Sequence, residues 1–139
     1  MPEPGAVADM AVSTFTADAL DGVAPTASLL EVADALTAGE VGAVVVRDGG
    51  KVVGIVSERD LVGALARRLP MDTTTVMEIA TTKLIWADAD APVIEVATEM
   101  LEHYVRHILI EEDGELVGMV SARDLLGAYS TDVDDEDLD

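Results

Sequence analysis

The chain has no cysteine, and this absence excludes disulfide bonds and thiolate metal sites. Long apolar runs are also missing, since none approaches the ~20 residues that span a bilayer. The first residues, MPEPGAVADM, lack the basic start and the apolar stretch of a signal peptide. Together these absences predict a cytoplasmic protein with no membrane partner.

Basic residues are scarce: eight lysines and arginines stand against 28 acidic residues, and the net charge is −20. Duplex nucleic acid and anionic membranes are bound through lysine and arginine, so neither is an expected partner. Six acidic residues lie in the tail 132–139, but the rest of the chain is acidic as well. An acidic, lysine-poor composition is typical of proteins from salt-loaded cytoplasm, where screening weakens self-repulsion, and it predicts a halophilic source.

Aromatic side chains make up only 3% of the chain, so the core must consist mainly of aliphatic side chains. A chain of 139 residues is long enough to bury roughly 68% of its unfolded surface, whereas half of it alone would be marginally stable. We therefore expect the two halves of the chain to pack on each other.

What the chain does contain is an internal repeat. Residues 54–61 read GIVSERDL, and residues 118–125, 64 positions later, read GMVSARDL. With this offset, residues 23–64 align with residues 87–128 without a gap, and 15 of the 42 pairs are identical. Such a regular repeat indicates one structural unit built twice, with two similar sites related by a pseudo-two-fold axis.

Each repeat predicts a strand, a helix, two strands joined by a tight turn, and a second helix. In the first repeat, Ser28-x-x-Glu31 is a capping box at the start of a helix, and Asp48-Gly49-Gly50 is a hairpin signal. The expected elements of this repeat span 20–23, 28–39, 43–46, 51–56 and 57–67.

The second repeat has the same order of signals. Pro92 is expected in the first turn of its first helix, and Asp113-Gly114 predicts the hairpin. The expected elements span 84–87, 92–103, 108–110, 116–120 and 121–129. Hairpins combined with crossover helices favour an α+β fold.

The chain is expected to divide into two repeats and a tail. The first repeat should span residues 5–69 and the second residues 70–129, with residues 67–75 as a linker rich in threonine. The acidic tail 130–139 has little to bury, and we expect it to be disordered.

The repeated serine and aspartate have two interpretations. Ser57-x-x-Asp60 and Ser121-x-x-Asp124 match the signature of a helix N-cap, in which the hydroxyl accepts a bond from a free N–H. A helix that starts directly after an apolar strand also points its first N–H groups into a crevice, and this arrangement suits an anion. The sequence leaves both interpretations open.

Neighbouring residues favour a ligand. Gly54 and Gly118 allow another backbone or a ligand to approach the strand closely. Arg59 and Arg123 add a permanently charged guanidinium suited to phosphate oxygens. An adjacent aspartate can accept hydrogen bonds from the two hydroxyls of a ribose. The combination predicts a nucleotide site in each repeat.

The two segments that carry the repeat resemble a known family. The sequence VGAVVVRDGGKV followed by GIVSERDL, repeated as VRHILIEEDGEL followed by GMVSARDL, resembles a CBS-domain pair (a Bateman module) over about residues 5–129. The resemblance implies tandem repeats with two clefts that bind AMP, ADP, ATP or S-adenosylmethionine. It also implies a disc-like homodimer.

Carried over by position, the resemblance implies eight ligand-binding residues. The aspartates would hold ribose hydroxyls, the serines would touch phosphate or ribose, and the arginines and the histidine would face phosphates. These residues are Ser57, Arg59, Asp60, Ser121, Arg123, Asp124, Arg106 and His107.

The two implied clefts are not equivalent. The first repeat has Gly42 and Ala43 at the positions of Arg106 and His107. Gly22 aligns with Trp86, so the first repeat lacks the indole ring that could stack on a base in the second.

Signatures of an enzyme are absent: the sequence has no P-loop, no nucleophile elbow and no HExxH motif. We therefore expect a non-catalytic module that senses an adenosine-containing ligand, with no obligatory cofactor and no dedicated metal site. Ligand occupancy would be reported through the geometry of a homodimer or to a separate effector protein. The alternative is a CBS-pair scaffold that mediates protein association and binds no nucleotide.

Overall fold

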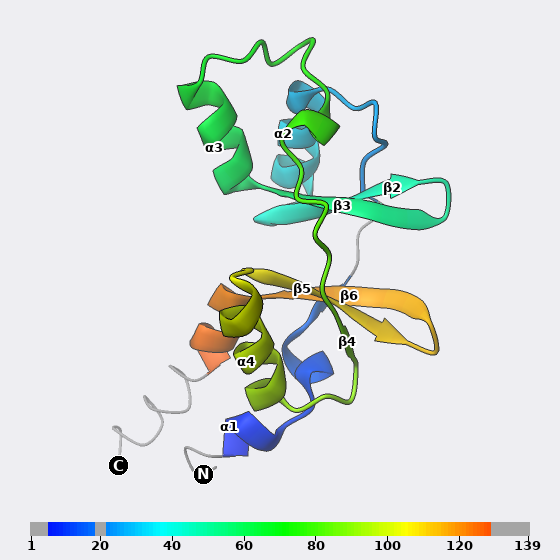
Figure 1. The fold of residues 1–139 in the computed structure, drawn as a ribbon, viewed down its shortest axis with the longest axis vertical. Coiled ribbons are helices and arrows are strands. Elements are labelled where there is room, and N and C mark those ends of the chain that lie inside the picture. Colours follow the sequence, from blue (N-terminus) through cyan, green and yellow to red (C-terminus); the bar gives the residue numbers. More distant parts are fainter. Residues whose placement is uncertain (1–5, 19–21, 129–139) are drawn as a thin grey trace. The chain divides into compact units, whose positions relative to one another are not determined.

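A computed structural model describes residues 6–18 and 22–128 of the chain (Figure 1). The chain divides into two compact units. Unit 1 contains residues 1–19 and 85–139, and unit 2 contains residues 20–84. Each unit includes one copy of the repeated serine–aspartate turn.

Unit 2 has the elements predicted for the first repeat after its first strand. They are α2 (Leu29–Gly39), β2 (Ala43–Asp48), β3 (Lys51–Ser57) and α3 (Glu58–Ala66). The unit also contains a 3-10 helix that was not predicted, η2 (Val76–Glu78). Strands β2 and β3 form an antiparallel pair. The predicted capping box starts α2, since the Ser28 hydroxyl accepts a bond from the Glu31 N–H and the Glu31 carboxylate accepts one from the Ser28 N–H.

The core of unit 2 is aliphatic, as the scarcity of aromatics requires. The apolar face of α2 and the valines of β2 and β3 are buried together, with Val32, Val46 and Val56 fully inaccessible. Burying one such side chain contributes roughly 1.5–3 kcal/mol, so this small cluster supplies much of the unit's stability.

Unit 1 contains the second repeat and the N-terminal segment. Its elements are α1 (Ala6–Asp9), η1 (Val12–Phe15), β1 (Ala17–Asp18), β4 (Trp86–Asp88), α4 (Val93–His103), β5 (His107–Glu112) and β6 (Glu115–Ser121). Residues 122–128 are helical. The sheet order is β1-β6-β5-β4, with β4 parallel to β5 and the other pairs antiparallel.

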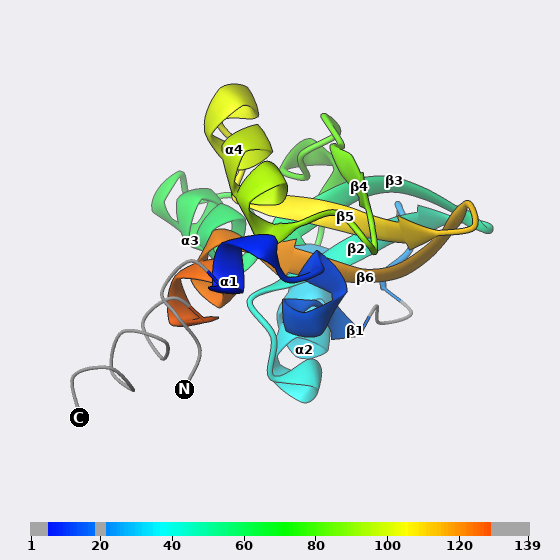
Figure 2. The same ribbon diagram turned by 90° about the horizontal axis from the view of Figure 1, so that it is seen from below.

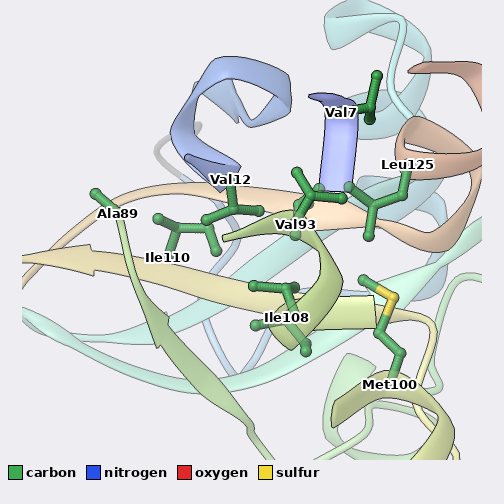
Figure 3. Close-up of a cluster of buried hydrophobic side chains, with 10 residues drawn as sticks. Val7, Val12, Ala89, Val93, Met100, Ile108, Ile110 and Leu125 are labelled. Carbon is green, nitrogen blue, oxygen red and sulfur yellow. The ribbon is translucent and has the colours of Figure 1, made fainter. Parts of the chain in front are cut away.

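The core of unit 1 lies between this sheet and its helices (Figure 3). Ile108 and Ile110 of β5 are fully buried, as is Val93 at the start of α4. Val12 is also fully buried there, so the N-terminal segment supplies part of this core.

The N-terminal segment joins unit 1 through backbone pairing. Ala17 and Asp18 pair with Met119 and Gly118 of β6, and the Val12 N–H donates to the Ala91 carbonyl at 2.8 Å. Helix α1 contacts α4 (Figure 2). The compact units therefore group the chain differently from the expected repeats 5–69 and 70–129, because β6 has an open edge that β1 fills.

The repeat extends to irregularities of the backbone. The β-ladder register shifts at Val46–Arg47 and at the equivalent Ile110–Glu111. Helices α2 and α4 both end with a left-handed residue, Glu40 in one and Tyr104 in the other. Since equivalent residues carry these features, the two hairpin–helix units are structural copies as well as sequence copies.

The strand expected at residues 20–23 is wrong for the part that the structure describes. Gly22 has a φ of 80°, which an extended strand does not allow. Val23 forms a single parallel bridge with Val46. Residues 20 and 21 lie outside the described residues.

The segment 67–75 was expected to link the repeats, but it folds back onto unit 2. The Leu29 and Leu30 N–H groups donate to the carbonyls of Thr74 and Met71 at 3.1 and 3.0 Å. Thr74 is buried as a result. The chain passes between the units at residues 84–85 instead.

Two smaller expectations also need comment. Pro92 is the N-cap of α4 and not a residue of its first turn, because its ψ of 146° is extended. The expected helix end at Tyr129 and the acidic tail 130–139 lie outside the described residues. Within residues 6–18 and 22–128, no helix is long and apolar enough to cross a bilayer.

Candidate functional site

The first copy of the repeated turn lies where β3 meets α3. Ser57 is the N-cap of α3, and its Oγ accepts a bond from the Asp60 N–H at 3.2 Å. Oδ2 of Asp60 in turn accepts bonds from the Ser57 N–H at 2.8 Å and the Ser57 hydroxyl at 2.9 Å. Both side chains are half-buried. The capping interpretation of the motif is therefore confirmed in this unit.

The second copy repeats the two bonds between backbone and side chain. The Ser121 N–H donates to Oδ2 of Asp124 at 2.9 Å, and the Asp124 N–H donates to Oγ of Ser121 at 3.0 Å. In both copies the cap uses Oδ2 of the aspartate and does not require Oδ1. Each aspartate can therefore cap its helix and still offer a carboxylate oxygen to a ligand.

A further backbone bond closes each turn onto the strand before it. The Glu58 N–H donates to the Gly42 carbonyl at 2.9 Å, and the Ala122 N–H donates to the Arg106 carbonyl at 2.8 Å. Fewer N–H groups are thus available to an anion than the sequence suggested. In a helix that starts at Glu58, the N–H of Arg59 is used by neither this bond nor the cap.

The β-ladders bring the remaining predicted residues to the same turns. His107 pairs with Ser121 across β5 and β6, and Ala43 pairs with Ser57 across β2 and β3. His107 is half-buried, and the side chain of Arg106, the residue before it, is exposed. Unit 1 thus gathers five of the predicted residues at one turn, since Arg123 and Asp124 follow Ser121, whereas the equivalent positions in unit 2 include glycine and alanine.

Arg59 and Arg123 follow the capping serines by two positions, and both side chains are exposed. The hydrogen bonds of the two turns do not involve their guanidinium groups. An exposed guanidinium beside a helix start is positioned to meet an arriving anion.

Gly54 serves packing against the chain itself. A Cβ at this position would lie 3.3 Å from the Thr81 carbonyl oxygen. The adjacent Ile55 exchanges two backbone bonds with Thr81, at 3.0 and 2.8 Å. Of the two interpretations of this glycine, close approach of another backbone is the one that the structure supports.

The structure adds one feature that motif analysis missed. Oε1 of Glu58 lies 3.2 Å from the position that a Cβ on Gly42 would occupy. The sequence signals were two mismatches between the repeats, where Glu58 aligns with Ala122 and Gly42 aligns with Arg106. No group of three metal-binding side chains occurs in the described part of the chain.

The caps make a prediction about stability. Replacing Ser57 with alanine should lower the free energy of unfolding by about 1 kcal/mol, because the Asp60 N–H loses its acceptor. Urea denaturation followed by circular dichroism measures this change. Thr73→Ala, at an exposed position of the same unit, is the matched control, and an equal loss in both variants would contradict the assigned cap.

Comparison with known proteins gives a consistent result. The family model described as CBS domain matches residues 18–67 and 76–131. The chain is 33% identical over 79 residues to Hypoxic response protein 1 of Mycobacterium tuberculosis; the match covers 56% of this chain and 55% of that protein's length.

Two solved structures are similar over most of the chain. An uncharacterized conserved protein from Pyrococcus horikoshii has a TM-score of 0.77 and 36% identity, covering 87% of this chain and 92% of that one. The CBS domain pair of protein MJ0100, crystallised with 5′-methylthioadenosine and S-adenosyl-L-methionine, has a TM-score of 0.74 and 25% identity. That match covers 88% of this chain and 98% of the other.

Proposed function

Because the chain belongs to the CBS-domain family, whose paired domains form regulatory modules, we propose that it binds an adenosine-containing ligand at its serine–aspartate turns. The ligand would be AMP, ADP, ATP or S-adenosylmethionine. The module would then signal occupancy through a homodimer or a separate effector protein, without catalysis of its own.

One observation carries this proposal: both units build the same turn with an aspartate oxygen that the cap does not need. Oδ1 of Asp60 and of Asp124 can accept a ribose hydroxyl while Oδ2 holds the serine N–H. The exposed Arg59 and Arg123 supply positive charge beside each aspartate. The similar MJ0100 pair, which was crystallised with two adenosyl compounds, supports the choice of ligand class.

Asparagine substitutions test the proposal without removing the cap. Asp60→Asn and Asp124→Asn keep an oxygen for the serine N–H but lose the carboxylate charge. A hydrogen bond to a charged group is worth about 1.5–3 kcal/mol, so each variant should lose roughly 10- to 100-fold in affinity at its own site. Isothermal titration calorimetry with AMP, ADP, ATP and S-adenosylmethionine measures the loss.

The matched control is Asp48→Asn. Asp48 lies at the other end of β2, paired with Lys51, whereas Ser57 pairs with Ala43 at the start of the strand. The Asp48→Asn variant should bind each of the four compounds with the same affinity as the unmodified protein. If none of the four compounds gives heat or raises the melting temperature, the ligand-sensing function is wrong.

A second candidate function, a scaffold for protein association, is favoured by a different observation. Large apolar side chains are exposed at equivalent helix positions of the two units, with Leu30 and Val62 in unit 2 matching Ile94 and Leu126 in unit 1. Such side chains suit an interface with a second copy of the chain. A dimer whose mass does not depend on ligand, together with silent titrations, would favour the scaffold.

A further inference from the structure

The two turns differ in charge at one pair of contacting positions. In each unit the first residue of the helix donates its N–H to the carbonyl of the residue before the strand. In unit 2 these residues are Glu58 and Gly42, and in unit 1 they are Ala122 and Arg106. The backbone contact is the same, but the charged side chain lies on the helix in unit 2 and on the strand side in unit 1, with opposite sign.

In unit 2 the Glu58 carboxylate occupies space that glycine leaves open. Oε1 of Glu58 lies 3.2 Å from the position of a Cβ on Gly42. The φ angle of Gly42 is not positive, so the backbone itself does not require a glycine there. What the glycine provides is room for the carboxylate next to the capped turn.

In unit 1 the first residue of the helix carries no charge. Ala122 is the residue equivalent to Glu58, and its methyl group packs against the apolar core. Arg106 stands where unit 2 has Gly42, and its side chain is exposed. A ligand that reaches the capped turn of unit 1 therefore meets two exposed guanidinium groups, of Arg106 and Arg123, whereas at the turn of unit 2 the carboxylate of Glu58 lies beside the single guanidinium of Arg59.

Charges at such distances decide which ligand binds. Two unit charges about 6 Å apart change the affinity of a ligand by roughly 3- to 100-fold at effective dielectric constants between those of water and a protein surface. At the unit 2 turn Glu58 therefore opposes the attraction of Arg59 for a phosphate, while it favours a sulfonium or an ammonium group.

From these contacts we infer that the two turns select ligands of different charge. Unit 1 takes a phosphate-bearing adenine nucleotide, and unit 2 takes an adenosyl compound without phosphate, either neutral or cationic. This inference rests on the proposed function, since it requires that both turns bind adenosine-containing ligands. Glu58 and Arg106 are then the residues that determine specificity.

The test compares AMP with 5′-methylthioadenosine, which share the adenosine part and differ in charge. In an Asp124→Asn background, which weakens the unit 1 turn, titration reports mainly on unit 2. Adding Glu58→Gln should improve binding of AMP relative to 5′-methylthioadenosine by about tenfold. Transplanting the unit 1 pair as Gly42→Arg with Glu58→Ala should improve it further.

The reciprocal variant addresses unit 1. In an Asp60→Asn background, Arg106→Gln should reduce binding of AMP relative to 5′-methylthioadenosine by about tenfold.

Glu31→Gln is the control for the change in net charge that Glu58→Gln makes. Glu31 lies in the same unit as Glu58, and glutamine preserves its capping box. This control should leave the ratio of the two affinities unchanged.

The possible outcomes distinguish a failure of charge selection from a failure of the proposed function. If both ligands bind but Glu58→Gln leaves the ratio of their affinities unchanged, selection by charge is wrong and the proposed function stands. If neither ligand binds the unmodified protein, the proposed function is wrong and this inference fails with it.

Discussion

Lowering the salt concentration from 2 M to 0.1 M KCl is expected to reduce the melting temperature of the protein by about 10 °C or more. The net charge of −20 on 139 residues repels itself in the compact state. The Debye length is about 10 Å at 0.1 M and about 3 Å at 1 M, so added salt removes most of this repulsion. A change of about 3 kcal/mol in the free energy of unfolding corresponds to a shift of this size.

The repulsion should act mainly on unit 1. The sequence of unit 1 contains 19 acidic and two basic residues, whereas unit 2 contains nine acidic and six basic residues. The single tryptophan, Trp86, lies in β4 of unit 1. Its fluorescence therefore reports on unit 1, while far-ultraviolet circular dichroism reports on both units. At low salt the fluorescence transition should begin at the lower temperature.

A variant with fewer charges provides the control. Exchanging four exposed glutamates of unit 1 for glutamine should raise the melting temperature at 0.1 M KCl and flatten its dependence on salt. Suitable positions are Glu95, Glu102, Glu112 and Glu115. A melting temperature that is the same at both salt concentrations would refute the expected adaptation to salt.

Replacing Gly22 with alanine is expected to lower the free energy of unfolding by about 3 kcal/mol. Two costs add at this position. The φ of 80° costs a residue with a Cβ about 1–2 kcal/mol. The new Cβ would also overlap the Val45 carbonyl oxygen and lie 2.8 Å from Cγ2 of Val45, and a rotation of the alanine side chain cannot relieve this overlap.

Gly49 separates these two costs. Its φ is 65°, but nothing lies within 4 Å of an added Cβ, so Gly49→Ala should lose only the conformational part, about 1 kcal/mol. Denaturation by urea measures both variants. Equal losses for Gly22→Ala and Gly49→Ala would mean that the approach to Val45 is not tight.

The sequence predicted most of the fold because its signals are local. The capping boxes at Ser28 and Ser57 and the hairpin at Asp113-Gly114 depend on residues within four positions of one another, and all of them are confirmed. The pairing of β1 with β6 joins residues about a hundred positions apart, and no local sequence pattern predicts such a pairing. The same is true of the return of residues 67–75 onto α2.

The candidate site, like the fold, could be predicted from the sequence only in part. The repeat predicted a helix cap at Asp60 and at Asp124, and the structure confirms that each carboxylate accepts a bond from the N–H of the capping serine. Their contact with a ribose remains a prediction. The different charges beside the two turns, from Glu58 in unit 2 and Arg106 in unit 1, could not be predicted from the motif. Their position depends on a backbone bond between residues that the hairpin brings together.

The discontinuous composition of unit 1 has a consequence for synthesis on the ribosome. Residues 20–84 of unit 2 leave the exit tunnel as one continuous piece, so this unit has all its parts before β5 and β6 exist. Residues 6–18 emerge earlier still, yet their partner strand β6 is translated about a hundred codons later. At 5–20 residues per second, this nascent segment waits roughly 5–20 s with Val12 and its other apolar side chains uncovered.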